Sequence, residues 1–298
     1  MQRRSLNNSL AILFALSGFA FHLAADASQP PDDEISHAIH AADRVVVESS
    51  GKFHLTIEGL WLYGPVSGHV QTPRGGQIGT TGKDRPTFGE IGINSASVFD
   101  FEAMPALGDH GMYIGGQWIR LEGERHLEQS LVSQGETFLL GARVDSHVQL
   151  DWYRLGYRYR IQRGDEAGLE LPRTEIYSRI GVAMLDYRYE LDGGGGGEVN
   201  QDFIRLAPQM GVEMEWHVSG RFSVAGELTS TLPFPNMPWI ATAQVAAKLR
   251  MIENNGLSLS GMVGAAYEKI SFHNSQDQSN DINADFGPML LLGLELRF

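Results

Sequence analysis

The sequence predicts an all-β protein, an antiparallel up-and-down transmembrane β-barrel of about ten strands, with eight or twelve strands as the alternatives. Three observations favour this fold. Long segments alternate between apolar and other residues with a period of two, long and short links alternate along the chain, and aromatic residues gather towards the ends of the segments. A soluble β-sandwich would need shorter strands, since strands of globular proteins average about five or six residues.

The first 27 residues have the three parts of a secretory signal peptide. Arg3 and Arg4 give a basic start, an apolar run extends from Leu10 to Ala25, and residues 25–27 fit an A-x-A cleavage site. We therefore expect residues 1–27 to be removed. The alternative is an N-terminal anchor helix, for which the apolar run is short.

A polar segment, residues 28–50, is expected to be a periplasmic leader in front of a barrel at residues 51–298. His37 and His40 lie three residues apart in a candidate short helix and form a potential metal-binding pair. Two histidines alone are a weak signal for a metal site. We expect a solvated leader and predict no metal and no cofactor.

The period of two begins after Gly51. In the first strand Phe53, Trp61 and Tyr63 share one face, whereas His54 and Glu58 share the other. The same alternation predicts strands at residues 52–63, 87–103, 110–122, 144–161, 173–190, 202–217, 221–231, 239–251, 257–272 and 285–298. They are long enough for the roughly 9–11 residues that a tilted strand needs in the hydrocarbon of a membrane.

Links after odd-numbered strands are mostly long and polar, and links after even-numbered strands are mostly short. The long links are 64–86, 123–143, 191–201, 232–238 and 273–284, and the short ones are 104–109, 162–172, 218–220 and 252–256. Outer-membrane barrels have long extracellular loops and short periplasmic turns. We therefore expect a protein of the outer membrane of a Gram-negative bacterium, with both termini in the periplasm.

Aromatic residues form two predicted girdles. Those expected near the outer ends of the strands are Trp61, Tyr63, Trp239, Tyr267 and Phe286. Those expected near the inner ends are Phe53, Tyr157, Tyr159, Trp216, Phe222 and Phe298. Amphipathic rings settle at the two headgroup levels of a membrane, so this sorting favours a spanning barrel.

Two segments leave the strand count or the alternation open. Residues 138–144 could form a further strand that turns at Asp145 and Ser146. In the fifth strand, one set of apolar residues lies on even positions and a second set on odd positions, which a β-bulge near Leu185 would reconcile. The first set is Ile176, Ile180, Val182 and Met184, and the second is Leu185, Tyr187 and Tyr189.

The last residues resemble the C-terminal assembly signal of Gram-negative outer-membrane barrels, in which Gly293, Leu296 and Phe298 match the glycine, the apolar residue and the terminal aromatic residue. This resemblance implies recognition by the barrel assembly machinery. The stretch from Leu62 to Tyr159, with its glycine-spaced first link, also resembles a set of uncharacterised outer-membrane β-barrel proteins. That family implies an architecture and supplies no catalytic residues.

The composition excludes several classes of protein. Lys and Arg total 23 and Asp and Glu total 36, for a net charge of −13, so no basic surplus is present to neutralise nucleic-acid phosphates. The chain has no cysteine, which excludes disulfides, zinc–thiolate sites, iron–sulfur clusters and thiol catalysis. No stretch of the mature chain approaches about 18 consecutive apolar residues, so we expect no membrane-spanning helix.

Inward-facing positions of the expected strands carry charges of both signs. They are Glu58, Arg154, Arg158, Arg160, Glu213, Glu215, Glu227, Lys248, Arg250, Glu295 and Arg297. A charge inside a low-dielectric wall needs a partner or water, so we expect paired networks that bridge and stabilise the lumen. The alternative is a narrow solute or ion path along the same charges, and the absence of a ring of one sign argues against strong ion selectivity.

Enzymatic outer-membrane barrels use a serine–histidine pair or paired acidic residues with histidine. Ser146 and His147 are adjacent, but neighbouring strand residues point to opposite faces. His54 and Glu58 are about 13 Å apart along their strand at ~3.3 Å per residue. We therefore predict no catalytic site.

The long links contain two weaker signals. Arg74, Lys83 and Arg85 could contact lipopolysaccharide phosphates, and the acidic residues Asp277, Asp281 and Asp285 could bind calcium. Ordinary solvated loops are the alternative for both. The predicted function is a non-enzymatic integral outer-membrane protein, either a structural element or a narrow solute pore. A surface adhesin or ligand-binding barrel that acts through its loops and a lipid-modifying enzyme are the rival classes.

Overall fold

A computed structural model describes residues 52–71, 86–133, 136–162, 173–193, 197–273 and 281–298. The predicted signal peptide (1–27) and leader (28–50) lie outside the described residues, as do Arg74, Lys83, Arg85 and Asp277. Among the described residues, no helix is long and apolar enough to cross a membrane.

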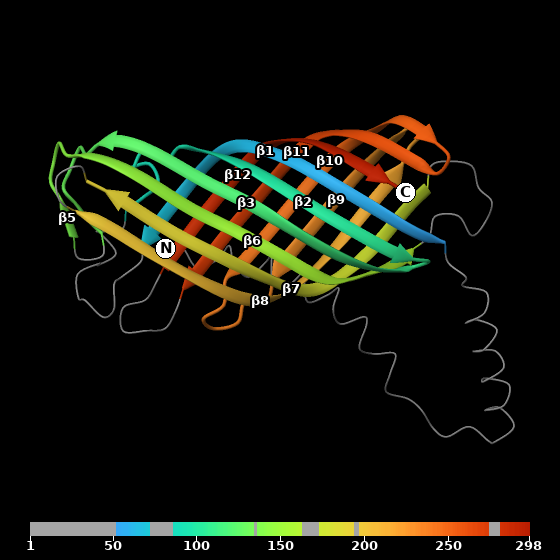
Figure 1. Ribbon diagram of the computed structural model, residues 1–298, viewed down its shortest axis with the longest axis horizontal. Helices are drawn as coiled ribbons and strands as arrows, with labels where there is room; N and C mark the ends of the chain where they lie inside the picture. The colour runs from blue at the N-terminus through green and yellow to red at the C-terminus, as the bar shows by residue number, and fades with distance from the viewer. Residues whose placement is uncertain (1–51, 72–85, 134–135, 163–172, 194–196, 274–280) are drawn as a thin grey trace, which may run out of the picture. The chain divides into compact units, whose positions relative to one another are not determined.

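Ten antiparallel strands form a closed barrel in the described part of the chain, as the alternation predicted (Figure 1). Strands that follow one another around the barrel pair with each other, and the first pairs with the last. The barrel strands are β1 (Phe53–Gln71), β2 (Ser95–Leu107), β3 (His110–His126), β6 (Arg143–Gln162), β7 (Arg173–Asp192), β8 (Glu198–His217), β9 (Phe222–Thr231), β10 (Trp239–Asn254), β11 (Leu257–His273) and β12 (Asp281–Arg297).

The two ends of the barrel differ. The terminal end is the end at which β1 begins and β12 stops, and it carries the short links between β2 and β3, β8 and β9, and β10 and β11. The opposite end is called the loop end. Figure 1 shows the terminal end at the right, and at the left β3, β6, β7 and β8 reach far into the loop end.

Two strand boundaries differ most from the prediction. β1 continues to Gln71 instead of stopping at Tyr63, and β2 begins at Ser95 instead of residue 87. The intervening residues include a turn whose apolar side chains Phe88, Ile91 and Ile93 are fully buried. These side chains are apolar because they pack inside the barrel at the loop end, not because they belong to a membrane-facing strand.

The link between β3 and β6 contains no additional barrel strand in its described part. β4 (Leu131–Ser133) and β5 (Glu136–Phe138) form a separate two-stranded hairpin, and β6 runs continuously through Asp145 and Ser146. Leu131 and Phe138 are buried in the same apolar cluster as the interior of the loop end. The suggested strand at 138–144 was therefore wrong.

The expected β-bulge near Leu185 was also wrong. β7 pairs with both neighbours in unbroken register from Tyr177 to Asp192, which includes Leu185. Leu185 and Tyr187 face inward on the same parity as Arg179, while Ile180 and Val182 face outward. The apolar residues of β7 change from outward to inward positions because the barrel interior itself changes from polar to apolar along this strand.

The interior has two layers. Near the terminal end it holds charged side chains, whereas towards the loop end it is filled by apolar ones. The apolar layer includes Val70, Leu121, Val148, Leu150, Trp152, Leu185, Tyr187, Tyr189, Ile270, Phe272, Ile282 and Phe286. On the outside, large apolar side chains are exposed all around the barrel, among them Ile180, Leu206, Leu228 and Leu294. A continuous apolar outer band is what a lipid-contacting barrel requires.

Most of the predicted girdle residues point outward. All six expected near the terminal end are exposed, as are Trp61, Tyr63 and Tyr267 towards the loop end. Phe286 is an exception, because it is fully buried. Two residues separate Phe286 from Met289 on β12, whereas one residue separates the paired Ala266 and Glu268 on β11. Because of this extra residue, even-numbered side chains of β12 face inward before it and odd-numbered side chains face inward after it.

Candidate functional site

Two ion-pair networks occupy the interior near the terminal end. The central network contains Asp100 and Glu102 from β2, Arg154 and Arg158 from β6, Arg179 from β7, Glu213 from β8 and Glu227 from β9. Arg154 binds both oxygens of Asp100, at 2.6 and 3.0 Å, and donates to Glu102 at 2.5 Å. Such two-point contacts are the strongest type of ion pair between side chains.

Arg179 is the hub of the central network. Its guanidinium lies 2.6 Å from Glu102, 2.8 Å from Glu227 and 3.0 Å from Glu213. Glu213 and Glu227 are directly paired across β8 and β9, an arrangement that repels unless a cation lies between them. Arg179 supplies that cation and ties β7 to strands on both sides of the lumen.

Tyrosine rings support two of these arginines. Arg179 stacks over Tyr113 with 3.9 Å from the guanidinium carbon to the ring centre, and Arg158 stacks over Tyr177 at 3.5 Å. Arg158 also pairs with Glu213 at 2.5 Å. Stacking on a ring restricts the arginine side chain while leaving its edge free to bind carboxylates.

The terminal network surrounds Lys248 on β10. Its ammonium lies 2.6 Å from Glu295, 3.7 Å from Glu58 and 3.9 Å from Glu215. Arg297 bridges Glu215 and Glu295 at 2.5 and 2.7 Å. Because these residues come from β1, β8, β10 and β12, the network crosses the seam at which the barrel closes.

A third group lines the wall beside these networks. Glu175 accepts a hydrogen bond from the Tyr177 hydroxyl at 2.7 Å, and lies 3.1 Å from Arg173 and 3.7 Å from His217. Arg160 lies 3.1 Å from Asp109 and also donates to the Gly108 carbonyl. The contacts of Arg160 fix the turn between β2 and β3 to the interior of the barrel.

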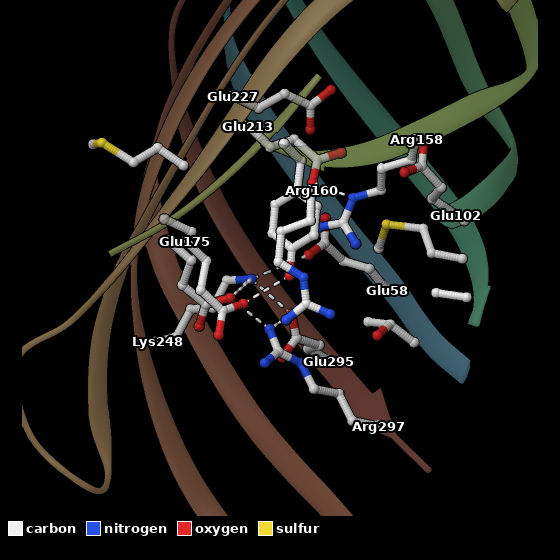
Figure 2. Close-up of a pocket in the computed structure, with 18 of the residues that line it drawn as sticks. Glu58, Glu102, Arg158, Arg160, Glu175, Glu213, Glu227, Lys248, Glu295 and Arg297 are labelled. Atoms are coloured by element: carbon white, nitrogen blue, oxygen red, sulfur yellow. Dashed lines mark hydrogen bonds and ion pairs between the residues drawn. The ribbon is translucent and has the colours of Figure 1, made fainter. Parts of the chain in front are cut away.

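A cavity of about 320 Å³ lies between the networks, and we call it the vestibule. Figure 2 shows charged side chains from several strands around it, including Glu58, Arg158 and Lys248. Its lining reaches Asp109, Arg173 and Phe298 at the terminal end. In the other direction the interior is filled, with Leu62, Trp152 and Met289 each at most 3% exposed.

Most of the predicted lumen charges are therefore brought together. Glu58, Arg154, Arg158, Arg160, Glu213, Glu215, Glu227, Lys248, Glu295 and Arg297 all line the interior or join its ion pairs. Arg250 does not belong to either network, because it pairs with Glu253 at 2.9 Å near the exposed turn after β10. Arg250 keeps the predicted parity and lines a small cavity at the terminal end together with Lys248 and Arg297.

The sequence interpretation missed Asp100, Glu102, Glu175 and Arg179. Asp100 and Glu102 alternate with Phe99 and Phe101, and that alternation was a usable signal for inward carboxylates. Arg179 was obscured by the apparent parity change in its strand.

The candidate catalytic residues are not assembled into a site. The Ser146 hydroxyl faces inward and donates to the carbonyls of Ile91 and Gly123. His147 lies on the other face, 3.7 Å from Glu122. Asp281 approaches His69, and Asp285 accepts hydrogen bonds from Tyr267 and Lys269. The described residues include no cluster of three or more histidine or acidic side chains suited to a metal ion.

The three residues of the C-terminal signal take part in closing the barrel. A Cβ added at Gly293 would lie 2.4 Å from the Leu60 side chain on β1, so only glycine fits there without a shift. Leu296 pairs with Ile57 across the seam, and the Phe298 amide donates to the Leu55 carbonyl at 2.9 Å. The Phe298 side chain itself points outward and is half exposed.

No family model and no curated protein matches the chain. Several solved structures of outer-membrane proteins have a similar fold. They include Ail, the attachment invasion locus protein of Yersinia pestis (10% identity, TM-score 0.36, 83% of this chain and 99% of that one), OprG from Pseudomonas aeruginosa (10%, 0.41, 84% and 97%) and the outer membrane protease OmpT from Escherichia coli (9%, 0.38, 82% and 97%). At these identities the likeness concerns the fold alone.

Proposed function

We propose that this protein is a closed, non-enzymatic structural barrel of the outer membrane of a Gram-negative bacterium, with the terminal end in the periplasm. One observation carries the proposal: the central ion-pair network and the apolar layer together fill the lumen between the vestibule and the loop end. The exposed apolar outer band supports a membrane location. Planar-bilayer recording tests the proposal, because a filled lumen conducts no ions.

The same packing argues against the narrow pore. A conducting path along the charges would need continuous water, but Arg179, Glu102 and Trp152 are each less than 5% exposed. The vestibule is open towards one end only and would fill with water without connecting the two sides. Mixed ion pairs in this position stabilise the wall and give no selectivity.

A surface-binding role through the loop end is the second candidate function. The outward side chains of β3, β6 and β7 become polar beyond the apolar band, as at Glu122, Asp145 and Arg188. A wall that continues past the lipid presents strands, rather than loops alone, to external partners. We propose that lipopolysaccharide is the lipid that surrounds this polar part of the wall at the loop end.

Phe298→Ala tests the proposed partnership with the barrel assembly machinery. We expect less folded protein in cells but nearly intact unassisted folding into detergent, because the side chain is half exposed whereas the seam uses the backbone. Heat-modifiable gel migration of membrane-extracted and refolded protein measures both quantities. Leu292→Ala, at another exposed apolar position on β12, is the matched control. Equal losses in both settings would contradict a role in recognition.

A further inference from the structure

One edge of β8 has no strand partner near the loop end. β8 pairs with β7 over its whole length, from Glu198 to His217. It pairs with β9 only from Gln209 to His217. Within the part of the chain that the structure describes, the remaining edge of β8 therefore faces no other strand.

A proline explains where the pairing stops. The Pro208 carbonyl accepts a hydrogen bond from the Leu232 amide at 2.8 Å, so the backbone groups of Pro208 face the β9 side. Proline has no N–H to continue the ladder on that side. β9 then ends at Thr231, and the chain leaves through a link that contains three more prolines.

The direction of the Pro208 carbonyl also identifies the free backbone groups. In an antiparallel strand the N–H and C=O of one residue point to the same side, and successive residues alternate. Since β7 and β8 are in unbroken register, Asn200, Asp202, Ile204 and Leu206 present their backbone groups to the open side. The Ile204 carbonyl accepts a hydrogen bond from its neighbour Arg205 at 2.8 Å, so a side chain occupies the position that a strand would take.

The side chains next to this edge indicate which strand would fit. Asp202 and Asn200 point outward, and the adjacent outward positions of β7 carry three acidic residues and one basic residue, namely Asp186, Arg188, Glu190 and Asp192. The charge beside this edge is therefore negative on balance. Ile204 and Leu206, nearer the apolar band, are more than half exposed. An added strand would thus meet carboxylates at one end and apolar side chains at the other. Unpaired edges of this kind are templates for strand addition.

We propose that the β8 edge from Asn200 to Leu206 binds an extended peptide segment of a partner protein, with basic and apolar side chains, by adding it as a further strand. This proposal deepens the second candidate function and rests on it. It is independent of the closed lumen, because a filled barrel and a conducting barrel would both present this edge.

Fluorescence anisotropy with a labelled peptide of four Lys-Val repeats tests the proposal on the full chain refolded in detergent. We expect saturable binding that Ile204→Pro weakens about tenfold, the effect of losing one or two backbone hydrogen bonds. The Ile204 N–H faces the open side, so proline removes no bond within the barrel. The same peptide with N-methylated alternate residues keeps its charge, cannot pair as a strand, and should not bind.

Charge is tested separately. Asp202→Asn should weaken binding, whereas Glu122→Gln, which removes an outward carboxylate on β3, should not. If Ile204→Pro fails to show heat-modifiable migration, the N-methylated peptide and the Asp202→Asn variant still decide the question. Equal binding of the N-methylated peptide would show attraction by charge alone and would overturn strand addition. No binding, or a dimer that pairs the edges of two copies, would also overturn the proposal.

Discussion

Arg179→Met is expected to lower the free energy of unfolding by about 3–5 kcal/mol, the range for removing one partner from a buried ion-pair network. Arg179 is 4% exposed and contacts Glu102, Glu213 and Glu227. Methionine fills a similar volume, so the decrease in the free energy of unfolding measures the cost of carboxylates left without a cation and not the cost of a cavity. Urea unfolding of the refolded protein, followed by tryptophan fluorescence, gives the value.

The matched control is Arg250→Met. Arg250 pairs with a glutamate that is 66% exposed, so its loss should change stability by less than about 0.5 kcal/mol. Arg158→Gln should have an intermediate effect, because Glu213 keeps Arg179 as a partner. Equal stability of all three variants would contradict the central network as a stabilising element.

Trp152→Ala is expected to cost about 3–5 kcal/mol for a different reason, the cavity left in a packed interior. Trp152 is 1% exposed and belongs to the apolar layer that separates the vestibule from the loop end. The same urea titration measures the change. Trp216→Ala, at an outward position that is 43% exposed, removes the same side chain without opening the interior and should cost much less. Equal costs would contradict a filled loop-end layer.

The fold could be predicted because each strand repeats one simple pattern. Lipid accepts only apolar side chains, so outward positions such as Leu155, Val212 and Leu294 alternate reliably wherever the strand crosses the membrane. This constraint acts on every spanning strand separately. The strand count, the antiparallel order and most inward charges followed from it.

The interior was less predictable because no single rule governs it. Inward residues are charged near the terminal end and apolar near the loop end, so Tyr187 and Tyr189 looked like lipid-facing residues. Phe88 and Ile91 looked like strand residues for the same reason, although they pack inside from a turn. The irregularity in β12 that buries Phe286 lies in its pairing with β1 and β11. The sequence pattern of a single strand carries no information on that pairing.

Single-channel recording in planar lipid bilayers tests the closed lumen most directly. The purified, refolded wild-type chain should add no open-channel steps to the bare bilayer, because Trp152, Leu185 and Met289 fill the interior beyond the vestibule. Arg179→Met, which disturbs the central network but leaves these side chains in place, should add at most brief and small openings. Large and stable wild-type conductance, unchanged by that substitution, would contradict the filled lumen and favour an open pore.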